Sequence, residues 1–567
     1  MYELNSEQEA VILAKSPVIC NAAAGSGKTR CLISKIRYII DRGADPSSIC
    51  AITFTNKAAK EMKERLKKYC RIEGMQVSTI HSMCVRIMKS FIQYTPLKLP
   101  FSIYDDSDQQ TVIKTLLKAR SMDDDPWNIL STISRMKGDP DYQILDDNVR
   151  EIKDAYQEIL IKNNACDFDD ILIYALQCLG HSDCKTFYND LWRHVLIDEF
   201  QDTSVIQYDI LKKLYDSSKT STLFVIGDLN QSIYSWRGAR PDNIQDFINT
   251  FKPTQCHLTY NYRSCSDVIT FANKFLQYGK PMVVKSSNKG MISMSIFKSY
   301  EDESERVADA IQKMGNYEET AIIYRVNARS MLFERALAKR RVPYKVYGDL
   351  PFYKRRIVKD LLSYCKAAVN ESDMESLIRI VNTPKRGFGE AKQEQLMRTG
   401  RGFLSEISME MPQMGAFLDL LGDIKDKAPA QALPMVVDRV RYPLDKEGDR
   451  ELVETLINVA SGFSTLDELI LASTFLEEDS GKGVKLMTAH ASKGLEFDRV
   501  FVVGIEDGLW PHQLCTNVAE EQRLFYVAVT RARRYLNLSY SQSRMYRGNS
   551  LTLKPSSLYE KSRGAFG

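Results

Sequence analysis

The sequence lacks the patterns that mark several common classes of protein. Its 12 cysteines form no C-x-x-C pair and no Cys/His ligand spacing, which argues against a zinc module or an iron–sulfur cluster. No run of about 18 apolar residues occurs, and no signal peptide precedes Leu4, so we expect neither membrane insertion nor export. Free thiols in a large enzyme instead fit a reducing cytoplasm.

A strong excess of charge of one sign is also missing. The chain has 77 basic and 73 acidic residues, for a net charge of +4, so any nucleic acid partner must be held in a local groove. Apolar residues make up 44% and charged residues 26%, as in an ordinary soluble globular protein. The 567 residues are too many for one core and favour about three to five domains.

Apolar runs of strand length alternate with amphipathic helix patterns along most of the chain, which is typical of an α/β fold. The expected strands are Pro17–Cys20, Ile49–Phe54, Met75–Thr79, His194–Ile197, Leu223–Ile226, Met291–Phe297, Thr320–Tyr324, Tyr344–Tyr347, Val484–Met487 and Val500–Val503. Two stretches, 91–165 and about 387–482, lack strand patterns and indicate helical insertions. We therefore predict an α/β protein with two cores, each interrupted by a mainly helical insertion, and a poorly ordered tail.

The most informative segment is Ala22–Thr29, with the sequence A-A-A-G-S-G-K-T. It follows an apolar strand pattern and leads into a helical one, the order in which a chain builds a polyphosphate cradle. Small residues let backbone N–H groups converge on the phosphates, Lys28 reaches the β/γ oxygens, and the Thr29 hydroxyl ligates Mg²⁺. The usual first glycine is Ala22 here. The segment predicts a protein that binds and hydrolyses a nucleoside triphosphate.

A second nucleotide-site element follows the buried strand pattern Val195–Ile197. Asp198 and Glu199 come directly after it, so both carboxylates lie at the carboxyl end of the strand. We assign Asp198 to Mg²⁺ and Glu199 to the general base that deprotonates the attacking water. Taken alone, such an acidic pair could equally lie in a solvated turn without a catalytic role. The phosphate loop upstream favours the catalytic role.

Further segments match the motifs of one family, in the same order. They are Leu4–Gln8, Ala51–Met62, Ser78–Ser82, Leu196–Thr203, Ile226–Ala239, Asn261–Ser264, Leu486–Phe497 and Glu521–Ala532. The chain therefore resembles the UvrD/Rep/PcrA group of superfamily 1A DNA helicases, from Leu4 to about Pro555. The resemblance implies two RecA-like P-loop NTPase cores with parallel sheets, 1A and 2A, which carry insertions 1B and 2B. The implied domains are 1–90 and 166–255 for core 1A, 91–165 for 1B, 256–386 and 484–555 for core 2A, 387–483 for a short 2B, and 556–567 for the tail.

The resemblance also implies roles around ATP and Mg²⁺, the expected cofactors. Gln8 reads adenine, Tyr262 stacks on it, and Glu496 holds the ribose hydroxyl. Gln231 senses the γ-phosphate, and two arginines expected in the second core reach the same group. The implied ATP-binding residues are Gln8, Ala22, Ala23, Ala24, Gly25, Ser26, Gly27, Lys28, Thr29, Tyr262, Arg263, Glu496 and Arg531. The implied catalytic residues are Lys28, Glu199, Gln231, Arg263 and Arg531, and the Mg²⁺ ligands are Thr29 and Asp198.

Aromatic side chains beside hydroxyl and basic groups indicate single-stranded DNA, because bases stack on such rings without sequence preference. The expected DNA contacts are Thr53, Phe54, Thr55, Thr79, His81, Tyr234, Trp236, Arg237 and His512, with Phe168 as a further candidate. Core packing is the alternative role for each aromatic side chain, and a structural role is equally open for His512 and Phe168. Tyr234 and Trp236 follow Gln231 closely, which favours a link between base pockets and the phosphate sensor.

The chain departs from the family pattern at a few positions. Ala23 replaces a glycine in the phosphate loop, Ile80 replaces a phenylalanine, and Leu229-Asn230 replaces two acidic residues. Insertion 2B is shorter than the family leads us to expect. Thr552 stands near the expected tip of the strand-separating hairpin, Ser541–Pro555.

The leading hypothesis is an ATP- and Mg²⁺-dependent helicase that moves 3′→5′ on single-stranded DNA and unwinds duplex DNA; its polarity rests on the resemblance. A translocase that displaces proteins but unwinds little by itself is the alternative, and a non-hydrolysing ATP-gated clamp is a remote third. The expected partners are single-stranded DNA and single-strand/duplex junctions, bound by a monomer that can self-associate for unwinding. We expect no membrane partner and a cytoplasmic location at the nucleoid, or in the host cytoplasm if a phage encodes the chain.

Overall fold

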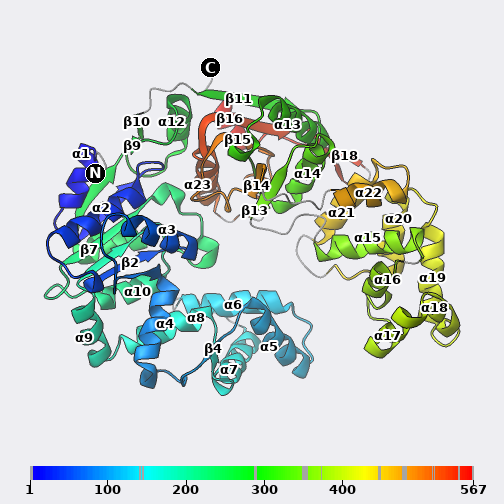
Figure 1. Ribbon diagram of the computed structural model, residues 1–567, viewed down its shortest axis with the longest axis horizontal. Coiled ribbons are helices and arrows are strands. Elements are labelled where there is room, and N and C mark those ends of the chain that lie inside the picture. Colours follow the sequence, from blue (N-terminus) through cyan, green and yellow to red (C-terminus); the bar gives the residue numbers. More distant parts are fainter. Residues whose placement is uncertain are drawn as a thin grey trace. The chain divides into compact units, whose positions relative to one another are not determined.

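The structure of the protein is a computed structural model (Figure 1). It describes residues 4–139, 142, 146–285, 290–347, 355–371, 373–444, 449–475, 482–513, 515, 517–546 and 549–564. The chain forms two compact units: Met1–Ser264 with Asn273–Ser287, and Cys265–Ala272 with Asn288–Gly567. Within the described ranges, every helix is too short or too polar to span a bilayer. All 12 cysteines are free thiols.

The first unit is built on a six-stranded parallel sheet in the order β3-β2-β6-β7-β1-β8. Its strands are β1 (Val18–Ala22), β2 (Ile49–Thr53), β3 (Gln76–Thr79), β6 (His194–Ile197), β7 (Thr222–Gly227) and β8 (Thr254–Leu258). Its helices outside the insertion are α1 (Ser6–Leu13), α2 (Lys28–Asp41), α3 (Asn56–Lys67), α4 (Ile80–Ser90), α8 (Phe168–Cys178), α9 (Ser182–Leu191), α10 (Val205–Leu214) and α11 (Asn243–Phe251).

Alternate side chains of these strands enter two separate hydrophobic cores. Val18, Cys20 and Ala22 of β1 join the core that includes α1, α2 and α3, whereas Ile19 joins the core that includes α4, α8 and α10. Because helices cover both faces of the sheet, its strands are nearly continuous apolar runs, which is why the sequence predicts them well. Each fully buried valine, leucine or isoleucine side chain contributes about 1.5–3 kcal/mol to folding.

The insertion of the first unit packs α5 (Asp106–Ala119), α6 (Pro126–Gly138) and α7 (Asp147–Lys162) around a core of their own. β4 (Ser102–Ile103) and β5 (Ala165–Cys166) pair in parallel where the insertion begins and ends. The buried ammonium of Lys137, in the last turn of α6, donates to Asp167 and Asp170 at the start of α8, at 2.6 and 2.8 Å. This ion cluster ties the insertion to the sheet-bearing part of the unit.

The second unit is built on another six-stranded parallel sheet, in the order β11-β16-β15-β12-β14-β13. Its strands are β11 (Met291–Phe297), β12 (Thr320–Tyr324), β13 (Tyr344–Tyr347), β14 (Val484–Thr488), β15 (Phe497–Val502) and β16 (Ala532–Ser541). The helices around it are α12 (Ser266–Ala272), α13 (Tyr300–Met314), α14 (Ser330–Lys339), α23 (Val518–Val529) and α24 (Ser557–Arg563).

The predicted fold class, two RecA-like α/β cores with helical insertions, is confirmed.

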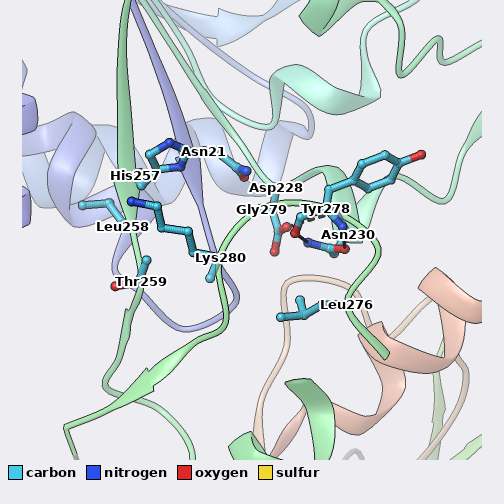
Figure 2. A pocket seen from close by; sticks show the side chains of 11 residues that line it. Asn21, Asp228, Asn230, His257, Leu258, Thr259, Leu276, Tyr278, Gly279 and Lys280 are labelled. Atoms are coloured by element: carbon cyan, nitrogen blue, oxygen red, sulfur yellow. Dashed lines mark hydrogen bonds between the residues drawn. The ribbon is translucent and has the colours of Figure 1, made fainter. Parts of the chain in front are cut away.

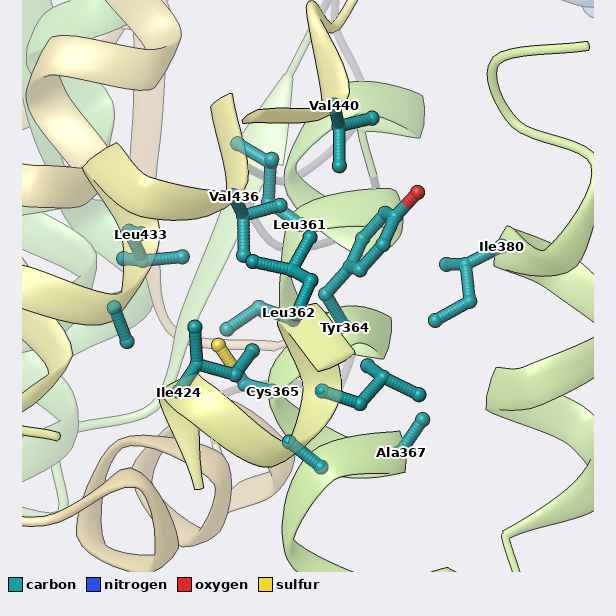
Figure 3. Packing of buried hydrophobic residues seen from close by; sticks show 14 of the residues in the cluster. Leu361, Leu362, Tyr364, Cys365, Ala367, Ile380, Ile424, Leu433, Val436 and Val440 are labelled. Carbon is teal, nitrogen blue, oxygen red and sulfur yellow. The ribbon is translucent and has the colours of Figure 1, made fainter. Parts of the chain in front are cut away.

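The insertion of the second unit begins earlier than predicted. Its helices are α15 (Arg356–Val369), α16 (Met374–Val381), α17 (Glu390–Thr399), α18 (Gly402–Ile407), α19 (Pro412–Ile424), α20 (Pro429–Val440), α21 (Asp449–Ala460) and α22 (Leu466–Phe475). We predicted a start at residue 387, but α15 and α16 precede it and share one core with α19 and α20 (Figure 3). The apolar face of α15, including Leu361 and Leu362, is buried in that core, so α15 belongs with the helical insertion.

The boundary predicted between residues 255 and 256 is also displaced. It falls within β8, which pairs in parallel with β1 so that Cys256 lies beside Cys20. The first unit therefore continues to Ser264, and Arg263 lies in it rather than in the second core. β8 is an edge strand with one buried side chain, Leu258, so it lacks the apolar run that reveals the central strands.

The C-terminal region differs from its prediction in two respects. The expected hairpin is present as antiparallel β17 (Ser543–Tyr546) and β18 (Asn549–Thr552), but Thr552 pairs with Ser543 at the base, not near the tip. We predicted a poorly ordered tail, but its residues Ser557–Arg563 form α24. Its Leu558 and Tyr559 are buried, and the Tyr559 hydroxyl donates to the Ser295 carbonyl at 3.2 Å.

Candidate functional site

The segment Ala22–Thr29 forms a loop between the end of β1 and the start of α2. Gly25 and Gly27 have φ values of 67° and 87°, which L side chains rarely adopt. A Cβ on Gly25 would lie 2.6 Å from the Asn261 amide nitrogen, so a close approach also requires glycine there. No side chain of the described residues caps the α2 N-terminus, so its dipole and first N–H groups face the loop. The loop therefore fits a polyphosphate.

The two alanines that depart from glycine cause no strain in this loop. Neither Ala22 nor Ala23 has a positive φ, so a Cβ is tolerated at both positions. The Ala23 N–H donates to the Leu258 carbonyl at the end of β8, at 3.0 Å. The backbone of Ala23 is thereby fixed to the neighbouring strand, and nothing in the structure explains the choice of alanine over glycine there.

The acidic pair stands beside the start of α2. The Thr29 hydroxyl donates to the Asp198 carboxylate, and Lys28 Nζ lies 4.0 Å from Glu199 Oε2. Burial, with the charge of Glu199 second, raises the pKa of Asp198. Glu199 itself has φ 53° and ψ 43°, a left-handed conformation that costs a non-glycine residue about 1–3 kcal/mol. Such strain clusters at functional sites and holds the carboxylate in one direction.

The donors of this site suit Mg²⁺ bound together with phosphates. One carboxylate and one hydroxyl, Asp198 and Thr29, are hard oxygen ligands of the kind that Mg²⁺ takes from proteins. The described residues contain no group of three or more His, Cys, Asp or Glu side chains that could hold a metal by themselves. The remaining ligands would have to come from water and the nucleotide, which is the usual situation for Mg²⁺.

Gln201, which sequence reasoning missed, connects the acidic pair to the next strand. Its Nε2 donates to Glu199 Oε2 at 2.6 Å, and its Oε1 accepts from the Asp228 N–H at 2.9 Å. Asp228 in turn accepts from Gln231 Nε2 at 2.6 Å. Gln201 is fully buried, so its amide orients the Glu199 carboxylate and the Asp228 backbone without contact with solvent. Its position within Leu196–Thr203 was the only signal in the sequence.

The predicted adenine residues surround the same loop. Gln8 Nε2 donates to the Ser26 carbonyl at 3.1 Å, and Gln8 forms a capping box with Asn5 at the start of α1. The Asn5 amide donates to the Tyr262 hydroxyl, and the Tyr262 N–H donates to the Gly25 carbonyl at 3.0 Å. Tyr262 is 45% exposed, so one face of its ring can take an adenine base.

Arg263 lies next to the phosphate loop within the first unit. Asn261 accepts from the Arg263 N–H at 2.9 Å and donates to the Ala24 carbonyl at 2.7 Å. A Cβ on Gly25 would come within 2.8 Å of the Arg263 Cβ. Our expectation that this arginine belongs to the second core is wrong, but its backbone is fixed beside the loop.

The second unit holds Arg531, Glu496 and His512. The Arg531 guanidinium donates to the carbonyls of Val527 and Leu495, at 2.8 and 2.9 Å. Glu496 accepts from Arg533 at 2.7 Å.

The His512 N–H donates to Glu521, at 3.4 Å. Glu521 also forms a bidentate pair with Arg325, which follows β12: Oε2 accepts from Nε at 3.0 Å and Oε1 accepts from Nη2 at 2.8 Å. Sequence reasoning missed Arg325 and Glu521, which fix the loop that carries His512.

Three of the predicted DNA contacts form one aromatic surface. Phe54, after β2, stacks on Tyr234 with ring centroids 5.2 Å apart and an interplanar angle of 15°. The ring centroid of Trp236 lies 6.4 Å from that of Tyr234, and Trp236 is 62% exposed. The Arg237 guanidinium lies over both rings, at 5.6 and 4.6 Å. An exposed aromatic group with a cation beside it fits the stacked bases and phosphates of a single strand.

The remaining DNA candidates of the first unit lie at the ends of β2 and β3. Thr53 and Thr79 are register partners, and the hydroxyls of Thr79 and Thr55 cap α4 and α3. Helix N-termini at this edge favour phosphate groups. His81 contacts Phe168 edge-on with centroids 6.1 Å apart, and burial lowers the pKa of His81. The structure therefore brings Phe168 to His81, while Phe168 stays 49% exposed.

The fold and site define a P-loop NTPase of two RecA-like units, and comparison with known proteins identifies its family. The model of the UvrD/REP helicase N-terminal domain matches residues 4–252, and that of the UvrD-like helicase C-terminal domain matches 256–414 and 440–543. The ATP-dependent DNA helicase PcrA of Staphylococcus epidermidis (strain RP62A) is 33% identical over 98% of this chain and 85% of its own length. PcrA of Staphylococcus aureus (strain Mu50) is also 33% identical, with the same coverage. The chain belongs to the UvrD/Rep helicase family.

Proposed function

We propose that this chain is an ATP-dependent DNA helicase that moves 3′→5′ along single-stranded DNA and unwinds the duplex ahead of it. One observation carries the proposal: the hydrogen-bonded run from Glu199 through Gln201 and Asp228 to Gln231. The chain continues directly from Gln231 to the aromatic surface of Tyr234 and Trp236. A hydrolytic centre and a single-strand platform on one segment are what a DNA motor needs.

In the proposed reaction, ATP lies on the phosphate loop with its adenine against Tyr262. Lys28 offsets negative charge on the β- and γ-phosphates, and Thr29 and Asp198 would hold Mg²⁺, which supplies further charge neutralisation. Glu199 accepts a proton from water as the water oxygen bonds to the γ-phosphorus and the bond to the β,γ-bridging oxygen breaks. ADP and phosphate are the products.

Two arginines complete the proposed chemistry. Arg263 stands beside the loop, and Arg531 matches the family's second γ-phosphate arginine. Positive charge directed at the transferred phosphoryl group stabilises the transition state more than the ground state, so both residues serve turnover more than binding.

One experiment tests this proposal directly. ATP turnover and strand separation are measured side by side on 3′-tailed, 5′-tailed and blunt duplexes, with the purified full chain. We expect the 3′-tailed duplex to stimulate turnover and to be unwound. Unwinding that prefers the 5′ tail would overturn the proposed 3′→5′ polarity. ATP turnover that does not respond to DNA would overturn the proposed motor function.

The second candidate is a translocase that displaces proteins and unwinds little by itself. It is favoured by the hairpin, whose strands β17 and β18 are each only four residues long. Robust unwinding of the 3′-tailed duplex by a monomer would exclude this version. Streptavidin displacement from a biotinylated single strand, without unwinding, would support it.

A further inference from the structure

Asn230 is one of the departures from the family pattern, and the structure gives it specific partners. It precedes Gln231 and is buried, with 4% of its surface exposed. Its side-chain Nδ2 donates to the Tyr278 carbonyl at 2.9 Å, and its Oδ1 accepts from the N–H groups of Gln277 and Tyr278 at 2.8 and 3.0 Å. Figure 2 shows Asn230 next to Tyr278. The side-chain amide thereby both donates to and accepts from the backbone of one turn.

These contacts need an amide at position 230. A carboxylate could accept from the two N–H groups but could not donate to the Tyr278 carbonyl. It would instead place negative charge against that carbonyl oxygen. An alanine would remove all three of these hydrogen bonds, and losing hydrogen bonds to partly buried backbone groups is costly.

The turn that Asn230 binds belongs to the connection between the two units. The chain leaves the first unit after Ser264, contributes Cys265–Ala272 to the second unit, and returns to the first unit with Asn273–Ser287 before it leaves again. We call Asn273–Ser287 the connector. The connector is therefore joined to segments of the second unit at both of its ends.

The connector also contacts the nucleotide loop region of the first unit. Gly279 has φ 79°, and a Cβ there would lie 2.9 Å from Nδ2 of Asn21, which stands in β1 just before the phosphate loop (Figure 2). Further along, the Lys285 N–H donates to the Asn261 carbonyl at 3.2 Å. Asn261 is the residue that binds the Ala24 carbonyl. The connector is thus held by residues next to the site at several points.

A continuous run of hydrogen bonds joins the connector to the proposed catalytic base. The two oxygens of Asp228 have different partners: Oδ1 accepts from the Asn230 N–H at 3.0 Å, and Oδ2 accepts from Gln231 Nε2 at 2.6 Å. The N–H of Asp228 donates to Gln201, which donates to Glu199. A change in the bonding of Glu199 or Gln231 during hydrolysis therefore acts on Asp228 and, through it, on Asn230.

We propose that Asn230 is a positioning residue that transmits the nucleotide state of the site to the connector, so that hydrolysis is coupled to movement between the units. This inference rests on the proposed motor function. It assigns Asn230 a role in coupling ATP turnover to translocation, not in the chemistry itself.

The test compares Asn230→Ala with the matched control Asn273→Ala. Asn273 exchanges two hydrogen bonds with Met282 inside the connector, at 3.0 and 2.9 Å, but makes none to the Asp228 loop among the described contacts. The measured quantity is ATP consumed per nucleotide translocated on single-stranded DNA. We expect it to rise about 2- to 30-fold in Asn230→Ala and to stay near the wild-type value in Asn273→Ala.

Asn230→Asp sharpens the comparison because it keeps the acceptor and loses the donor. For Asn230→Asp we expect the ATP consumed per nucleotide to lie between the values of the wild type and Asn230→Ala. The inference is overturned if Asn230→Ala keeps the wild-type ratio, or if Asn273→Ala raises it equally. A wild type that does not translocate would instead refute the proposed function.

A second measurement needs no variant and remains decisive if Asn230→Ala fails to fold. Amide hydrogen exchange at Gln277 and Tyr278 is compared in the wild-type chain with ADP and with a non-hydrolysable ATP analogue. We expect the protection of these two amides to differ between the two nucleotides by severalfold. Equal protection in both states would overturn the link between the site and the connector.

Discussion

The two sheets of this chain have six parallel strands each, yet the charged groups at their carboxyl ends are arranged in opposite ways. In the first unit, Lys28 and Glu199 remain 12% and 24% exposed and are 4.0 Å apart. In the second unit, Glu303, Arg329 and Glu506 are almost completely buried and bonded to their neighbours. The first arrangement leaves charge available to a ligand, and the second uses charge to close the structure.

The buried cluster of the second unit joins several strands. Glu303, in the first turn of α13, pairs with Arg329 and accepts from Ser539 of β16 at 2.5 Å. Glu506, after β15, accepts from the Ser541 N–H at 2.8 Å, and burial raises its pKa. The same architecture therefore supports a reactive site or a structural anchor, depending on whether the charged groups stay partly exposed or are buried beside a counter-charge.

The largest effect is expected from the carboxylate of the first unit. Glu199→Gln should lower ATP turnover by about 10²- to 10⁴-fold while ATP still binds, because the proton acceptor is lost and the loop is intact. Turnover is measured by phosphate release, and binding by a fluorescent ATP analogue. The exposed Glu64 of α3 provides the control, Glu64→Gln, which should behave as wild type. Equal loss of binding and turnover would argue against a base.

The equivalent change in the second unit should affect stability and not chemistry. Glu303→Gln removes the counter-charge of the buried Arg329, so the free energy of unfolding of this unit should fall by about 3 kcal/mol. Urea unfolding followed by circular dichroism measures it. Glu301→Gln, in the same helical turn, should change the value by less than about 0.5 kcal/mol. An unchanged unfolding curve for Glu303→Gln would remove the contrast between the two units.

The smallest effect concerns the aromatic surface. Trp236→Ala should weaken binding of a single-stranded oligonucleotide by about 5- to 150-fold, because one stacked base contributes about 1–3 kcal/mol. Fluorescence anisotropy measures the Kd at fixed salt. Trp127, an exposed tryptophan of α6 outside this surface, gives the control Trp127→Ala, with no expected change. Equal weakening by both variants would mean that Trp236 has no special contact with DNA.

Most central strands could be predicted because both of their faces are buried. His194–Ile197 and Thr320–Tyr324 have the predicted bounds. Met291–Phe297 also has them, although it is an edge strand without a fully buried side chain. β8 was missed because its sequence, T-Q-C-H-L, has only one buried side chain. The start of the second insertion was missed for another reason: α15 is amphipathic in either location, and only the core around it decides which helices it joins.

The candidate site was predictable where its residues follow one another in the chain. The phosphate loop and the acidic pair are each recognisable from consecutive residues, and the parallel pairing of β1, β7 and β6 brings Lys28, Thr29 and Asp198 together at one edge of the sheet. Gln201 carried no chemical signal by itself, because its role depends on Asp228 from the neighbouring strand. No single-sequence pattern indicates such a partner.

The sequence by itself determined the two α/β units, the phosphate loop with its acidic pair, and the aromatic segment after Gln231. Only the tertiary structure decided that Arg263 belongs to the first unit and that Asn230 binds the connector. The physical reason is the separation along the chain between the residues that make each contact. Local motifs are set by neighbouring residues, whereas the Asn230–Gln277 bond joins residues 47 positions apart, and only the packing of the first unit brings them together.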